Sequence, residues 1–158
     1  MEILDTAKKH WLLLLFSVAY IVGFGIYYVK SGNTEFLGYL AVLLIIGGIL
    51  IATAHVSKIQ TFTLWLLSIW GLLHMAGGSV KIGDGVLYGW KMFELVNRGG
   101  DFYILKMDQV IHMYGFFVAA VVIYQLIAPR VAKMHWGLLV FLAIAGSLGL
   151  SAFNEVIE

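Results

Sequence analysis

Long apolar segments without charged residues constrain the fold of this chain more than any other feature. Trp11 to Val29 and Phe36 to Ala54 each contain only uncharged residues, and each has a length at which an α-helix crosses a bilayer, about 20 residues. Together with three later runs, they predict an all-α integral membrane bundle of five transmembrane helices. The whole chain, residues 1–158, is expected to form a single polytopic domain. The later runs are Thr61 to Ala76, Val110 to Ala128 and Trp136 to Ile157.

Composition supports the membrane class and excludes several functions. The chain is 61% hydrophobic and 12% charged, whereas soluble domains are about half apolar and about a quarter charged. A net charge of +1 gives no basic surface for nucleic acid. The absence of cysteine excludes disulfides, thiolate metal sites and a cysteine nucleophile. The lipid bilayer is therefore the expected partner.

The positive charges of the short loops predict how the chain is inserted. Cytoplasmic loops of membrane proteins are enriched in lysine and arginine, and here one side has five such residues while the other has Lys30 alone. We therefore expect a multi-pass protein of the cell (inner) membrane with a cytoplasmic N-terminus and the 77–107 loop outside. The five residues are Lys8, Lys9, Lys58, Arg130 and Lys133.

Residues 77–107 form the one long connection. Gly77–Gly78 is expected to close the third helix, since glycine is favoured at helix C-termini. Long loops without structure are usually functional or contain a hidden element. Val86 to Val96 is apolar apart from Lys91 and Glu94, and it is too short to span a bilayer. A short interfacial or re-entrant helix is predicted for this segment.

Several polar residues are expected to converge on one membrane face. With five spans, the end of the third, the start of the fourth and the end of the fifth lie on the same side. Their helical neighbours are mostly small residues such as Gly71 and Gly115, which allow helices to approach closely. The polar side chains are therefore expected to point into the bundle. They are His74, Asp108, His112, Glu155 and Glu158.

Imidazoles and carboxylates at helical spacing are typical ligands of Zn, Mn or Fe. One divalent transition metal is predicted, with four ligands. Glu158 would be a fifth ligand or a general base, and Arg98 would hold the anionic head group of a lipid or lipid-linked substrate. The predicted ligands are His74, Asp108, His112 and Glu155.

Structural explanations of the same residues stay open. Asp108 at a helix start suits an N-cap or a first-turn acid. His74 would then be an interfacial histidine bonded to a carbonyl, and His112 would be satisfied by Asp108. Two other functions also fit the sequence: a proton- or cation-coupled small transporter that uses these residues as a relay, and a non-catalytic membrane scaffold or partner subunit.

Short motifs from Trp70 to the chain end resemble those of the YjdF-like family of small multi-pass inner-membrane proteins, which has no assigned activity. Asp108-x-x-x-His112 at a helix start is also, more distantly, similar to VanZ-like membrane proteins. The family's chains usually continue into a further helix, so this chain is expected to be a shortened member or a fragment. The matching motifs are Leu73-His74-Met75-Ala76-Gly77-Gly78, Asn97-Arg98, Asp108-x-x-x-His112-x-x-Gly115 and Asn154-Glu155-x-x-Glu158.

Overall fold

The described part of the chain is dominated by α-helices. A computed structural model describes residues 8–93, 105–131 and 133–157; the side chains of Ala54, His55 and residues 153–157 lie outside the description. The predicted all-α membrane bundle is confirmed, and the helix bounds lie within three residues of the predicted spans. Within the described residues the five long helices are α2 (Trp11–Ser31), α3 (Thr34–Ser57), α4 (Thr61–Gly77), α5 (Met107–Ile127) and α6 (Trp136–Ile157).

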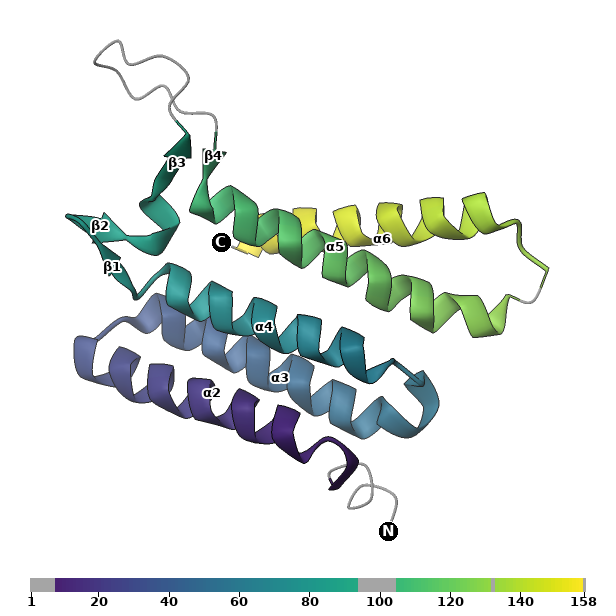
Figure 1. Cartoon of the computed structure of the whole chain (residues 1–158), viewed down its shortest axis with the longest axis horizontal. Helices are drawn as coiled ribbons and strands as arrows, with labels where there is room; N and C mark the ends of the chain where they lie inside the picture. Colours follow the sequence, from purple (N-terminus) through teal and green to yellow (C-terminus); the bar gives the residue numbers. More distant parts are fainter. Residues whose placement is uncertain (1–7, 94–104, 132, 158) are drawn as a thin grey trace.

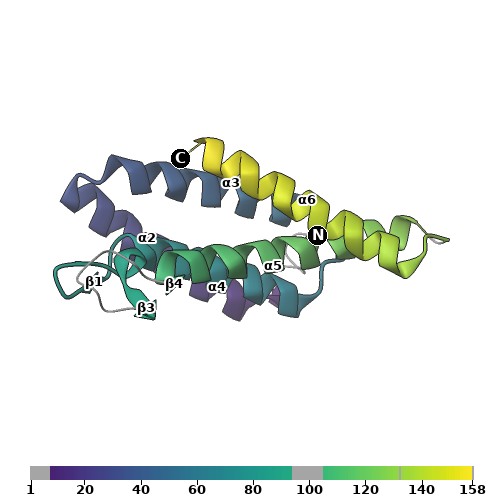
Figure 2. The same ribbon diagram turned by 90° about the horizontal axis from the view of Figure 1, so that it is seen from above.

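The helices form two groups that meet at α4 and α5. Helices α2, α3 and α4 lie together, and α5 and α6 form an antiparallel pair (Figure 1). The α2–α3 turn, the small strands and the end of α6 lie at one end of the bundle (Figures 1 and 2). The start of α2 and the α3–α4 and α5–α6 connections lie at the other. This alternation of ends is the arrangement expected of five spans.

Three segments of the described chain are long and apolar enough to cross a membrane: Trp11–Ser31, Thr34–Thr53 and Met107–Arg130. Helix α4 is shorter but occupies the centre of the bundle, where it contacts α2, α3 and α5. The outward faces hold large exposed apolar side chains, such as Leu15 and Phe141. A surface of this kind suits lipid rather than water.

The prediction of a short helix over residues 86–96 is wrong for residues 86–93, the part that the structure describes. Gly83 turns the chain with φ +58°, a left-handed conformation that glycine adopts without strain. The segment then forms short antiparallel pairs separated by a 3₁₀ turn; residues 94–96 lie outside the described residues. The pairs are β1 (Lys81–Ile82) with β2 (Gly85–Val86) and β3 (Lys91–Phe93) with β4 (Leu105–Lys106), and the turn is η1 (Leu87–Gly89).

Gly77 and Gly78 end α4 as predicted, but the need for glycine there is spatial. The φ of Gly78 is −87°, which other residues also adopt. A Cβ on Gly77 would lie 2.1 Å from Cε1 of Tyr88, and one on Gly78 would lie 1.7 Å from Cζ of Phe36. These two glycines therefore leave room for two aromatic rings at the end of α4.

A buried hydroxyl network fixes α2 against the end of α4. The Tyr28 hydroxyl donates to the carbonyl of Met75 at 2.6 Å, and the Ser79 Oγ donates to the Tyr28 hydroxyl, also at 2.6 Å. Tyr28 is fully buried and packs in the core cluster with Phe36 and Met75. This network holds the chain immediately after His74 in place.

We expect Tyr28→Phe to lower the free energy of unfolding by about 1 kcal/mol, because two buried hydrogen bonds are lost and Ser79 and the Met75 carbonyl keep only their bond to each other, at 2.9 Å. Thermal unfolding in detergent measures the effect. Tyr27→Phe is the matched control, since Tyr27 is 43% exposed. Equal melting temperatures for the two variants would show that the hydroxyl network does not contribute to stability.

Candidate functional site

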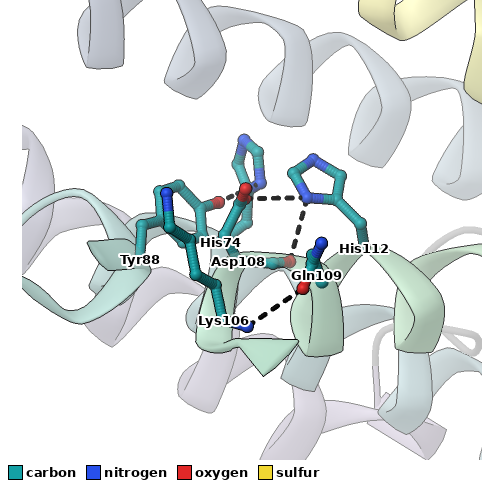
Figure 3. Close-up of polar contacts among 6 residues, drawn as sticks. All are labelled: His74, Tyr88, Lys106, Asp108, Gln109 and His112. Atoms are coloured by element: carbon teal, nitrogen blue, oxygen red, sulfur yellow. Dashed lines mark hydrogen bonds and ion pairs between the residues drawn. The ribbon is translucent and has the colours of Figure 1, made fainter. Parts of the chain in front are cut away.

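Two histidines face each other where α4 meets α5. His74 comes from the last turn of α4 and is 6% exposed, and His112 comes from the second turn of α5. Their ring centroids are 6.2 Å apart and the ring planes are nearly perpendicular, at 87°. Figure 3 shows the two rings next to each other on one side of α5. Of the five polar residues predicted to converge, these two therefore lie side by side.

Asp108 fixes the orientation of the His112 ring. Nδ1 of His112 lies 2.9 Å from Oδ1 of Asp108 and 3.0 Å from its backbone carbonyl oxygen (Figure 3). A carboxylate and a carbonyl only accept hydrogen bonds, so Nδ1 carries the proton. In the neutral ring the lone pair is then on Nε2. That atom is buried, and it has no hydrogen-bond partner among the described residues.

Tyr88 is the hydrogen-bond partner of His74. Its hydroxyl lies 2.6 Å from Nδ1 of His74, and its ring stacks on that of His112 with a centroid distance of 6.2 Å. Tyr88 belongs to the 3₁₀ turn η1, and it fits because Gly77 has no side chain. Sequence reasoning missed Tyr88. The glycine pair is the one signal in the sequence, and it predicts a helix end without naming the ring that packs on it.

Trp70 and Gly115 bring the two helices together beneath the histidines. A Cβ on Gly115 would lie 2.3 Å from Nε1 of Trp70, so the indole occupies the space that glycine leaves on α5. The Trp70 ring also packs on His74, with centroids 5.4 Å apart. The small residue predicted on this face of α5 therefore makes room for a large ring of α4. Within the described residues, Nε1 of Trp70 is buried without a hydrogen-bond partner.

The start of α5 shows which of the two structural roles open to Asp108, N-cap or first-turn acid, it has. Lys106 is the N-cap residue, and its backbone N–H donates to Oε1 of Gln109 at 3.0 Å (Figure 3). Asp108 is therefore a first-turn acid, in the favourable position relative to the helix dipole, and not the N-cap itself. Its side chain remains 41% exposed, while one of its oxygens holds His112.

Three predicted site residues are not tested by these contacts. Arg98 and Glu158 lie outside the described residues. Glu155 belongs to the last turns of α6, at the same end of the bundle as His74 and His112, but its side chain lies outside the description. Among the residues that are described, no group of three or more His, Cys, Asp and Glu could hold a metal ion. The described site is therefore two histidines, Asp108 and Tyr88.

The sequence matches the model of one protein family. Neither a curated protein nor a solved structure matches the chain. The family DUF2238, described as a predicted membrane protein, matches residues 9–158. This match covers all five helices and every motif discussed above. The chain therefore belongs to the DUF2238 family of predicted membrane proteins.

Proposed function

We propose that this membrane protein binds one divalent transition metal, Zn, Mn or Fe, through Nε2 of His74 and Nε2 of His112. The observation that supports this most is the His112 ring. Asp108 holds its Nδ1–H, while the buried Nε2 has no partner among the described residues. Metal-binding histidines commonly donate their second ring nitrogen to a carboxylate or a carbonyl in this way.

The sequence predicted Asp108 as a metal ligand; in this proposal Asp108 instead orients the ligand His112. Tyr88 does the same for His74, since a metal on Nε2 leaves Nδ1–H free to donate to the tyrosine oxygen. Both rings are then fixed before the ion arrives. Rings held in one orientation lose less conformational freedom when the ion binds. The hydrogen bond at Nδ1 also raises the basicity of Nε2.

The geometry requires a small closure and further ligands. Metal–nitrogen distances of about 2.0–2.1 Å place the centroids of two imidazoles on one tetrahedral ion about 5 Å apart. The observed 6.2 Å is about 1 Å longer, so the proposal requires the two rings to move about 1 Å closer while keeping their Nδ1 hydrogen bonds. We propose Glu155 as the third ligand, because α6 brings it to this end of the bundle.

The proposed ion would act on a lipid or lipid-linked substrate at the membrane surface predicted to be outside. A bound metal polarises a carbonyl or phosphoryl oxygen or activates water. Glu158 is proposed as general base and Arg98 as the residue that holds an anionic head group. The motifs that resemble the YjdF-like and, more distantly, the VanZ-like proteins support a role in the membrane but name no reaction.

Element-resolved metal content of the purified protein tests the proposal. We expect a stoichiometric amount of one transition metal in the wild type and background content in His112→Ala, because the best-oriented ligand is lost. His135→Ala is the matched control: this exposed histidine precedes α6 at the opposite end of the bundle, and its ring nitrogen Nδ1 accepts from the Gly137 N–H. Identical trace content in wild type and His112→Ala would reject the metal site.

A further inference from the structure

A second site lies at the opposite end of the bundle. A cavity of about 540 Å³ opens between the start of α2, the end of α3 and the start of α4. This volume lies within the usual range of small-molecule pockets, about 300–1,000 Å³. We call it the α2/α4 cavity. Its lining residues are Lys9, His10, Leu50, Ser57, Lys58, Ile59, Gln60, Thr61 and Leu64.

The charged side chains that line the α2/α4 cavity are cationic. Lys9 and Lys58 are both exposed, and no acidic residue is part of the described lining. Ser57 is only 5% exposed, and no partner for its hydroxyl occurs among the described residues. The Nδ1 atom of His10 is likewise buried without a described partner. The cavity therefore offers two positive charges together with unused polar groups.

The backbone adds further positive potential. Helices α2 and α4 both begin at this cavity; their N-cap residues, His10 and Gln60, make no side-chain cap bond, and neither first turn contains an acid. The first N–H groups of a helix have no partner within the helix, and the dipole places partial positive charge there. Two such helix starts beside two lysines favour an anion.

The opposing end of α3 does not cancel this potential. Helix C-termini have partial negative charge, but here Nη2 of Arg130 donates to the carbonyl of Val56 at 3.3 Å. Lys58 itself caps the helix in a left-handed conformation with φ +51°. Arg130 thus binds a carbonyl at the negative end of α3, and Lys58 is the next residue after the helix.

We infer that the α2/α4 cavity binds a phosphate-ester anion, either the headgroup of an anionic phospholipid or a free phosphate ester. The cavity is lined by two lysines and by the starts of α2 and α4, where Gln125 accepts a hydrogen bond from the Gln60 N–H and the following N–H groups have no partner within their helix. Cationic and N–H groups are the partners that phosphate oxygens require. It lies on the face that the lysine and arginine distribution predicts to be cytoplasmic. The inference does not depend on the metal proposal, which concerns the other end of the bundle.

Calorimetric titration of the full chain in a neutral detergent tests the inference. The probes are short-chain phosphatidylglycerol, glycerol phosphate and inorganic phosphate. We expect Lys9→Gln and Lys58→Asn each to weaken binding about fivefold, the loss for about 1 kcal/mol per lysine. Asparagine tolerates the left-handed conformation of residue 58. Lys133→Gln is the matched control, since this exposed lysine does not line the cavity.

Each outcome decides a separate point. Binding of the lipid without binding of the two soluble phosphates identifies a headgroup site, and equal binding of all three identifies a site for free phosphate esters. Ser57→Ala removes one hydroxyl from the cavity lining and should weaken binding about threefold without affecting folding. No binding of any probe, or an equal loss with Lys133→Gln, would overturn the inference.

Discussion

Gly78→Ala is expected to destabilise the protein by about 3 kcal/mol, the upper part of the range for overpacking a core. The new Cβ would lie 1.7 Å from Cζ of Phe36 and 2.3 Å from both Cε atoms of that ring. Phe36 would have to leave its position, because the backbone at residue 78 cannot shift without ending α4 differently. The effect is steric, since a φ of −87° suits alanine as well as glycine.

Phe36 has little space into which it can move. It is 7% exposed and belongs to the core cluster with Tyr28 and Met75. Its ring also lies 6.4 Å from the rings of His74 and Tyr88, measured between centroids. Displacement of Phe36 should therefore disturb the histidine site as well as the fold.

Thermal unfolding in detergent measures the loss, and the Gly48→Ala variant is the control. A Cβ on Gly48 meets no atom within 4 Å, so alanine there should be neutral or stabilising by up to about 1 kcal/mol, the difference in helix propensity. Equal melting temperatures for Gly78→Ala and Gly48→Ala would contradict the steric explanation.

The helices could be predicted from the sequence because their length and hydrophobicity are local properties. Trp11 and Trp136 each begin a helix at the predicted residue, since an apolar run of spanning length is a strong signal. The chain between α4 and α5 could not be predicted in this way. Residues 86–93 are mostly apolar, which favours a short helix in the sequence. The turn at Gly83 and the pairing of Lys91–Phe93 with Leu105–Lys106 determine the structure instead.

Topology alone predicts that His74, Asp108 and His112 lie on one membrane face, and the small residues beside them predict that they point into the bundle. The end of the third span and the start of the fourth must lie on the same membrane face. Which atoms bond there was not predictable. The Asp108–His112 contact follows from helical spacing, but the Tyr88–His74 bond joins a helix to a 3₁₀ turn 14 residues later, and that turn depends on the tertiary fold.

Asp108→Asn is expected to weaken metal binding about 10- to 100-fold, the usual cost of losing a group that orients a metal ligand. Asparagine keeps the size of the side chain but loses the charge. Its amide can also present N–H₂ to Nδ1 of His112, which would reverse the tautomer and place the proton on Nε2. A protonated Nε2 cannot bind a metal. The free energy of unfolding should change little, since the Asp108 side chain is 41% exposed.

Titration of the metal-free protein with Zn²⁺ or Mn²⁺ measures the affinity of each variant. Asp84→Asn is the matched control, because Asp84 is exposed in the turn between β1 and β2 at the same end of the bundle. If Asp108 acts through His112, Asp108→Asn should cause no further loss in a His112→Ala background. Additive losses would instead show that Asp108 binds the ion directly, and unchanged affinity in Asp108→Asn would show that the His112 ring is held by its neighbours alone.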